Sequence, residues 1–144
     1  MYGDRVYATV RFMVRNLDEI RRETARARIE RKARKGVPEL HAEGFLSNPT
    51  AKEAEMNMTP VPIVYLSGGK YVKSPEAWLD CIDYVADMIT DGDRKLLRTV
   101  ADRMEWREAV ETLHMDKTTY YRRRDKLFAL IAMRAAEMRL ITIG

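Results

Sequence analysis

The sequence contains very little of the chemistry that disulfides and metal sites need. Cys81 is its only cysteine, and His41 and His114 are its only histidines. A single cysteine excludes an internal disulfide, and this small set of ligands leaves no zinc site of the Cys/His type. The sequence also shows no signal peptide and no apolar run near the ~18 residues that a membrane span needs. These absences predict a reduced, cytoplasmic protein with no metal, no cofactor and no membrane contact.

Aromatic side chains are scarce, whereas charged side chains are abundant. Phe, Trp and Tyr make up 8% of the 144 residues and charged residues 33%, so the core must be aliphatic and modest. This length suits one domain, or one compact domain with an arm. Lys and Arg outnumber Asp and Glu by 26 to 22, and the excess is unevenly distributed. The position of the basic residues along the sequence therefore indicates more about binding partners than the net charge does.

The N-terminal stretch, residues 1–36, predicts one long helical arm. No Pro or Gly interrupts residues 4–35, and apolar residues recur at helical spacing over 6–20 before Gly36 and Pro38 end the pattern. The second half is strongly basic, and its cations are Arg21, Arg22, Arg26, Arg28, Arg31, Lys32, Arg34 and Lys35. Such a run could bind the phosphates of a DNA duplex and release counterions. The alternative is a solvated helix face that contacts nothing.

Residues 37–73 predict a linker with a short helix and one small β-hairpin. The short helix would run from Pro49 to about Met56, because proline is favoured in the first helical position. Extended segments at 63–66 and 71–73 then flank a Gly-Gly turn.

The Gly68-Gly69-Lys70 sequence in that turn does not match a phosphate-binding loop. Such a loop needs G-x-x-x-x-G-K-[ST] opening into a helix. Here the first glycine is missing, Tyr71 replaces Ser or Thr, and another extended stretch follows. The sequence therefore argues against a nucleoside triphosphate site.

Residues 74–144 predict a helical domain. Ser74 would cap a helix that begins at Pro75, and Asp91-Gly92-Asp93 would break it and cap the next one. The polar side of the first of these helices carries three aspartates, Asp80, Asp83 and Asp87. We interpret them as a solvated face, because no second acidic element is visible to complete a metal site. The alternative is a metal-dependent nuclease.

Residues 106–130 predict a helix-turn-helix. The first helix would run to about Leu113, His114 and Met115 would form the turn, and Asp116 would cap a second helix extending to about Leu140. The small core expected to join the two helices is Val110, Leu113, Met115, Tyr120 and Leu127. The candidate DNA-binding residues are Lys117, Thr118, Thr119, Tyr121, Arg122, Arg123, Arg124 and Lys126. They occupy the first turns of the second helix, where a helix-turn-helix presents side chains to bases and phosphates.

The distal half of this last helix has its own apolar face, made of Phe128, Ile131, Ala135 and Met138. Groove recognition needs no helix of that length. We therefore expect this face to be either a dimer seam or a cover for the helix that begins near Pro75.

The order of these parts resembles a known family. The motifs at 48–51 (Asn-Pro-Thr-Ala), 74–79 (Ser-Pro-Glu-Ala-Trp-Leu), 93–97 and 119–124, with the hairpin, are similar to those of RinA/ArpU-type transcriptional regulators of phages and prophages. The resemblance spans residues 48–131. It implies a sigma-region-4-like helix-turn-helix that binds promoter DNA and activates late phage genes, with host RNA polymerase as a potential partner. It also implies that Lys117, Thr118, Tyr121 and Arg122 enter the major groove, with Arg123, Arg124 and Lys126 on phosphates.

The sequence thus predicts a mainly α protein, with a long N-terminal helix, one small β-hairpin and a helical domain containing a C-terminal helix-turn-helix. The predicted function is that of a phage transcriptional regulator, not an enzyme, that binds double-stranded DNA sequence-specifically. Because one helix-turn-helix contacts few base pairs, a homodimer or a second DNA-contacting arm is expected. The alternatives are a ring-forming DNA packaging protein of the small-terminase kind and an adaptor whose basic helix binds an acidic protein.

Overall fold

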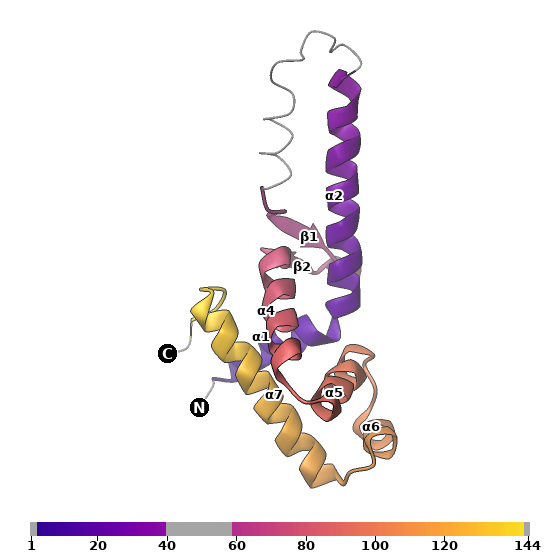
Figure 1. The fold of residues 1–144 in the computed structure, drawn as a ribbon, viewed down its shortest axis with the longest axis vertical. Helices are drawn as coiled ribbons and strands as arrows, with labels where there is room; N and C mark the ends of the chain where they lie inside the picture. The colour runs from indigo at the N-terminus through magenta and orange to yellow at the C-terminus, as the bar shows by residue number, and fades with distance from the viewer. Residues whose placement is uncertain (1–2, 40–58, 143–144) are drawn as a thin grey trace. The chain divides into compact units, whose positions relative to one another are not determined.

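The computed structural model describes residues 3–39 and 59–142, with side chains described over 3–32 and 59–142. Over these residues the chain is mainly helical with one two-stranded hairpin, so the predicted mainly α fold class is confirmed (Figure 1). The elements in chain order are α1 (Asp4–Arg15), α2 (Leu17–Glu39), β1 (Ile63–Tyr65), the short 3-10 turn η2 (Ser67–Gly69), β2 (Tyr71–Lys73), α4 (Pro75–Met88), α5 (Asp91–Ala101), α6 (Trp106–Leu113) and α7 (Lys117–Glu137). None of the helices in the described ranges is both long and apolar enough to cross a membrane.

The chain forms two compact units. One contains the residues up to Glu19 and those from Ala77 onward, and the other contains residues from Ile20 to Glu76. Helices α1, α5, α6 and α7 and nearly all of α4 belong to the first unit, which we call the helical unit. The hairpin and most of α2 belong to the second, which we call the hairpin unit.

The single N-terminal helix predicted from the sequence is in fact two helices. Asn16 leaves the helical conformation, with φ −108° and ψ 14°, so α1 ends at Arg15 and α2 begins at Leu17. The side-chain amide of Asn16 donates a hydrogen bond to the carbonyl of Phe12 at 2.8 Å. The backbone N–H of Asn16 donates to the same carbonyl at 3.0 Å, and at the break Arg103 donates to the carbonyl of Arg15 at 3.0 Å. The uninterrupted apolar spacing across residues 6–20 concealed the break.

The predicted end of the N-terminal helix at Gly36 is also wrong. α2 continues through Gly36 and Pro38 to Glu39. Glycine inside a helix costs only about 1 kcal/mol relative to alanine, so it weakens a helix without having to end it.

Within the helical unit, α1 packs against α7 and α5, and α5 and α6 each contact α7. The buried face of α1 consists of Val10, Met13 and Val14. The ring of Tyr7 meets the ring of Phe128 edge-on, with 5.4 Å between centroids. α1 and α7 thus share an interior although more than one hundred residues of chain separate Tyr7 from Phe128.

The distal face of α7 is part of this interior. Phe128, Ile131 and Ala135 are at most 2% exposed, and the thiol of Cys81 on α4 lies 3.6 Å from the carbonyl oxygen of Ile131. Of the two expectations for this face, the cover for the helix beginning at Pro75 is therefore confirmed and the dimer seam is wrong. Cys81 is a core residue, as predicted, and burial raises the pKa of its thiol to about 11.

Two predicted helix caps differ from the observed ones. Thr90, not the Asp91-Gly92-Asp93 run, caps α5, since its hydroxyl accepts a hydrogen bond from the N–H of Asp93 at 3.2 Å. Ser74 precedes α4 with φ +52°, a left-handed conformation instead of the extended backbone of an N-cap. α4 begins at Pro75 as predicted, whereas α5 already begins at Asp91, so the predicted break lies in the first turn of α5.

In the hairpin unit the strands pair antiparallel, as the sequence predicted, and Val64 lies opposite Val72. Gly68 and Gly69 have φ of +79° and +76°, which explains why glycine suits this turn. Strand β2 follows Lys70, so the turn does not open into a helix as a phosphate loop would. The predicted helix from Pro49 to Met56 lies outside the described residues.

Glu76 links the hairpin unit together. Its carboxylate accepts hydrogen bonds from two guanidinium nitrogens of Arg28 on α2 and from the N–H of Val61, each at 2.8 Å. These contacts join α2, the segment leading into β1 and the first turn of α4.

Candidate nucleic-acid interface

Helices α6 and α7 are joined by a tight connection of three residues, His114, Met115 and Asp116. His114 adopts φ 54° and ψ 49°, and the N–H of Met115 donates to the carbonyl of Val110 at 3.1 Å, which closes α6. Asp116 then caps α7, because its carboxylate accepts a hydrogen bond from the N–H of Thr119 at 2.9 Å. Hydrogen bonds from the side chain and backbone of Thr119 lower the pKa of Asp116, so the cap is ionised at neutral pH. The predicted turn and cap are confirmed.

The core between these helices is smaller than predicted. Ala109 is the buried residue of α6, and the predicted core residues Tyr120 and Leu127 are each 2% exposed on α7. Val110, Leu113 and Met115 are only half-buried. A small side chain at Ala109 allows α6 to approach its neighbours closely, whereas the sequence pattern favoured the larger aliphatic residues.

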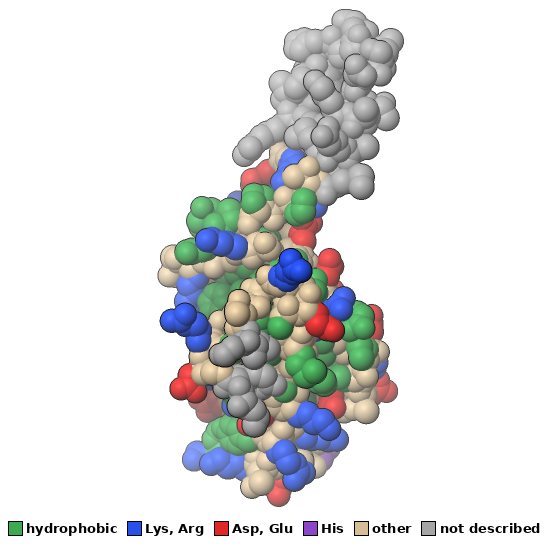
Figure 2. Space-filling model, turned by 90° about the vertical axis from the view of Figure 1, so that its left-hand side faces the viewer, with side chains coloured by type: hydrophobic (Ala, Val, Ile, Leu, Met, Phe, Trp, Pro, Cys, Tyr) green, Lys and Arg blue, Asp and Glu red, His purple; other side chains and the backbone are tan. Residues whose placement is uncertain are grey.

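The candidate DNA-binding residues of α7 differ in exposure. Lys117, Thr118, Arg122, Arg123 and Lys126 are exposed, whereas Thr119, Tyr121 and Arg124 are half-buried. Lys and Arg side chains gather at the lower end of the face drawn in Figure 2, at the height where α7 begins in Figure 1. The start of α7 therefore presents a cationic surface to solvent.

Three of these cations already have partners within the helical unit. The ammonium of Lys117 lies 4.5 Å from the ring centroid of Trp106, and the guanidinium of Arg123 lies 3.8 Å from a carboxylate oxygen of Asp93. Arg124 donates a hydrogen bond to the hydroxyl of Tyr7, and its guanidinium carbon lies 4.7 Å from the ring centroid of Tyr121. Arg124 is thus held among aromatic rings, unlike the exposed phosphate ligand that the resemblance implies.

The sequence did not predict the cleft that lies beside the start of α7. It has a volume of about 490 Å³ and five arginines in its lining. These are Arg11 and Arg15 from α1, Arg103 from the α5–α6 connection, Arg107 from α6 and Arg124 from α7. Tyr121 and Trp106 also line it, and we call it the arginine cleft. The sequence signal available was the i, i+4 spacing of Arg11 and Arg15, which places both on one side of α1.

The basic segment of α2 belongs to the other unit and is only partly exposed. Arg21, Arg22, Arg26 and Lys32 are exposed, Arg28 and Arg31 are half-buried, and Arg34 and Lys35 lie outside the described side chains. Arg28 is bound to Glu76, and Arg31 donates to the carbonyl of Thr59 at 2.6 Å. Arg28 and Arg31 thus contact other parts of the same unit, and the choice between a phosphate-binding arm and a solvated face stays a prediction for the exposed cations.

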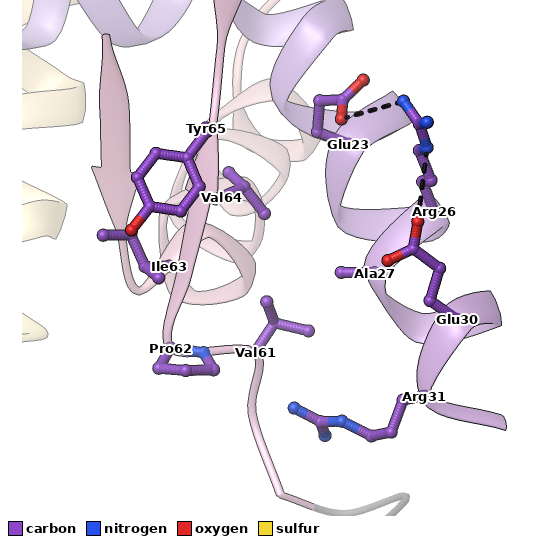
Figure 3. A pocket seen from close by; sticks show the side chains of 10 residues that line it. All are labelled: Glu23, Arg26, Ala27, Glu30, Arg31, Val61, Pro62, Ile63, Val64 and Tyr65. Carbon is purple, nitrogen blue, oxygen red and sulfur yellow. Dashed lines mark ion pairs between the residues drawn. The ribbon is translucent and has the colours of Figure 1, made fainter. Parts of the chain in front are cut away.

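A hollow of about 510 Å³ lies between this part of α2 and the chain around β1 (Figure 3). Two carboxylates, Glu23 and Glu30, lie on its α2 side, and each forms an ion pair with Arg26. Acidic and basic side chains alternate here, so this hollow lacks the one-signed charge of the arginine cleft.

The three aspartates of α4 do not form a metal site. Asp80 and Asp87 are exposed and Asp83 is half-buried. Across the described ranges, no three His, Cys, Asp or Glu side chains come together as metal ligands would. The metal-dependent nuclease alternative gains no support from the geometry.

Comparison of the chain with models of known protein families, with curated proteins and with solved structures found no match.

Proposed function

We propose that this protein binds double-stranded DNA through α6 and α7 acting as a helix-turn-helix, and regulates transcription. The observation that carries the proposal is the start of α7, where exposed Lys117, Thr118 and Arg122 follow directly on a capped N-terminus. A helix-turn-helix contacts the edges of base pairs with the first residues of its second helix.

Two further features support this proposal. The buried residues Ala109 and Tyr120 pack α6 and α7 together within one unit, and this packing fixes the position of one helix relative to the other. Arginine and lysine also form the commonest specific contacts to guanine in the major groove, each worth about 1–3 kcal/mol of discrimination. Lys117 and Arg122 are therefore the proposed base-contacting cations, with Arg123 and Lys126 on phosphates.

The regulatory role rests on the resemblance of the sequence motifs to RinA/ArpU-type regulators. By that resemblance the protein would activate late phage genes and act with host RNA polymerase. A small-terminase-like packaging protein would bind DNA as well, but would form a ring, so the native mass of the protein distinguishes the two.

The test is duplex binding over a salt series, with fragments of the genome that encodes the chain. We expect the Lys117→Ala/Arg122→Ala variant to lose most of its preference for the best-bound fragment, roughly 10-fold or more if each contact is worth 1–3 kcal/mol. The matched control is Arg5→Ala/Lys95→Ala, which removes the same charge from exposed positions of the same unit. If both variants bind every fragment as wild type does, α7 has no role in DNA binding, and the protein-adaptor alternative is favoured.

A further inference from the structure

The arginine cleft has a strong excess of positive charge. Of the described residues that line it, Glu105 is the one carboxylate, against five guanidinium groups. Arginine stays protonated at any pH at which a protein is folded, so this charge is permanent. Clustered like charges in a concave site raise the local concentration of an anionic ligand.

Two of the five arginines hold the structure together. Arg103 donates to the backbone carbonyl of Arg15 at 3.0 Å and also to the side chain of Asn16. Arg124 is bound to Tyr7, and its buried Nε has no hydrogen-bond partner among the described residues. Both charges contribute to the positive electrostatic potential in the cleft, but hydrogen bonds within the protein hold these two side chains in place.

The other three arginines are available to a ligand. In the part of the chain that the structure describes, Arg11, Arg15 and Arg107 form no ion pair, and Arg11 and Arg107 are exposed. The guanidinium of Arg107 lies 5.3 Å from the ring centroid of Trp106, and both residues line the cleft. Planar guanidinium groups bind phosphate oxygens through paired hydrogen bonds, so they suit a phosphate ligand.

The aromatic residues of the cleft do not form an open platform for base stacking. Cations already lie over them, since Lys117 is placed over Trp106 and Arg124 over Tyr121. Bases bound without pairing usually stack on exposed aromatic faces. The cleft therefore fits the sugar-phosphate backbone better than it fits unpaired bases.

We propose that the arginine cleft binds the phosphate backbone of the same duplex whose bases α7 contacts, with Arg11, Arg15 and Arg107 as the phosphate ligands. This inference rests on the proposed function. Tyr121 on the cleft wall follows Lys117 by four residues, about 6 Å along the helix axis, so the two surfaces are continuous along α7. The second DNA contact then comes from α1 and the first turn of α6, in place of the basic segment of α2.

The first test compares salt dependence of binding to a mixed-sequence duplex. Because each phosphate contact contributes about 0.9 to the slope of log K against log salt, the Arg11→Ala/Arg107→Ala variant should have a slope about 1.8 less steep. It should also lose affinity equally for all fragments, since phosphate contacts carry no sequence information. The Arg5→Ala/Lys95→Ala control should keep the wild-type slope. If an Arg22→Ala/Lys32→Ala variant on α2 flattens the slope and the cleft variant does not, the second contact lies on α2 and the proposal is overturned.

The second test uses inorganic triphosphate as a probe that needs no DNA. The chain has two tryptophans, and Trp106 lines the cleft whereas Trp78 is 4% exposed in α4. Triphosphate should shift the indole N–H resonance of Trp106 and leave that of Trp78 in place, and the shift should vanish in the Arg11→Ala/Arg107→Ala variant. If neither resonance moves, the cleft is not a phosphate site.

The two tests separate failure of this inference from failure of the proposed function. If Lys117→Ala/Arg122→Ala abolishes fragment preference while the cleft variant keeps the wild-type slope, duplex binding stands and the cleft assignment is overturned. If wild type binds no duplex but triphosphate still shifts Trp106, the proposed function fails, and the assignment of the cleft to duplex phosphates fails with it. Both proposals are supported when the first variant changes preference and the second changes only slope and overall affinity.

Discussion

Replacing Ile131 by alanine tests whether the distal face of α7 belongs to the interior of a single chain. Ile131 is 0% exposed, and the substitution removes three buried carbons at about 0.8 kcal/mol each. The remaining cavity adds to this loss, while the better helix propensity of alanine offsets a few tenths of a kcal/mol. We therefore expect the free energy of unfolding to fall by about 3 kcal/mol, roughly a hundredfold in the unfolding equilibrium.

The assay is urea unfolding followed by circular dichroism, with Met133→Ala as the matched control. Met133 lies on the same helix two residues further on and is 57% exposed, so its loss should cost less than about 0.5 kcal/mol. The wild-type midpoint should not depend on protein concentration, because the partners of Ile131 are in its own chain. A midpoint that rises with concentration in wild type but not in Ile131→Ala would refute this reasoning and restore the dimer seam.

Three further perturbations have definite expected outcomes. Glu76→Ala leaves the N–H of Val61 without its acceptor and should lower the free energy of unfolding by about 1–2 kcal/mol in a thermal melt, and a change near zero would show that solvent replaces the contact. Burial raises the pKa of the Cys81 thiol from 9.0 to about 11. Because the unfolded chain loses this proton at lower pH than the folded protein does, the stability contributed by the buried neutral thiol is full below pH 9 and is lost as the pH rises toward 11. Wild type should accordingly lose more stability than Cys81→Ala over that interval, and equal losses would contradict the assignment. His114→Gly should raise the free energy of unfolding by up to about 1 kcal/mol, because glycine adopts φ +54° without strain, and it should leave duplex binding unchanged; a lower melting temperature would count against the turn geometry.

Local signals in the sequence were sufficient for the elements near the candidate interface. Asp116 followed by Lys-Thr-Thr predicted the start of α7, and the glycine pair predicted the hairpin turn, because caps and turns are decided by neighbouring residues. The break at Asn16 was missed because the apolar periodicity continues across it, while the hydrogen bonds that Arg103 donates to Arg15 and Asn16 come from a residue far along the chain.

Long-range packing decided the rest. No local pattern relates Arg11 and Arg15 to Arg107, since they are brought to one cleft only when α1 packs against α7 and α5. The same packing encloses Phe128 and Ile131, a face that the sequence could equally have assigned to a dimer. It also holds Arg124 among the rings of Tyr7 and Tyr121, where the family resemblance had implied a phosphate ligand. The sequence by itself determined where α4 and α7 begin and where the cations of α7 lie along the chain, because hydrophobic periodicity and capping act over a few residues. Only the tertiary structure decided which of those cations remain available to a partner, because that depends on contacts between segments far apart in the chain.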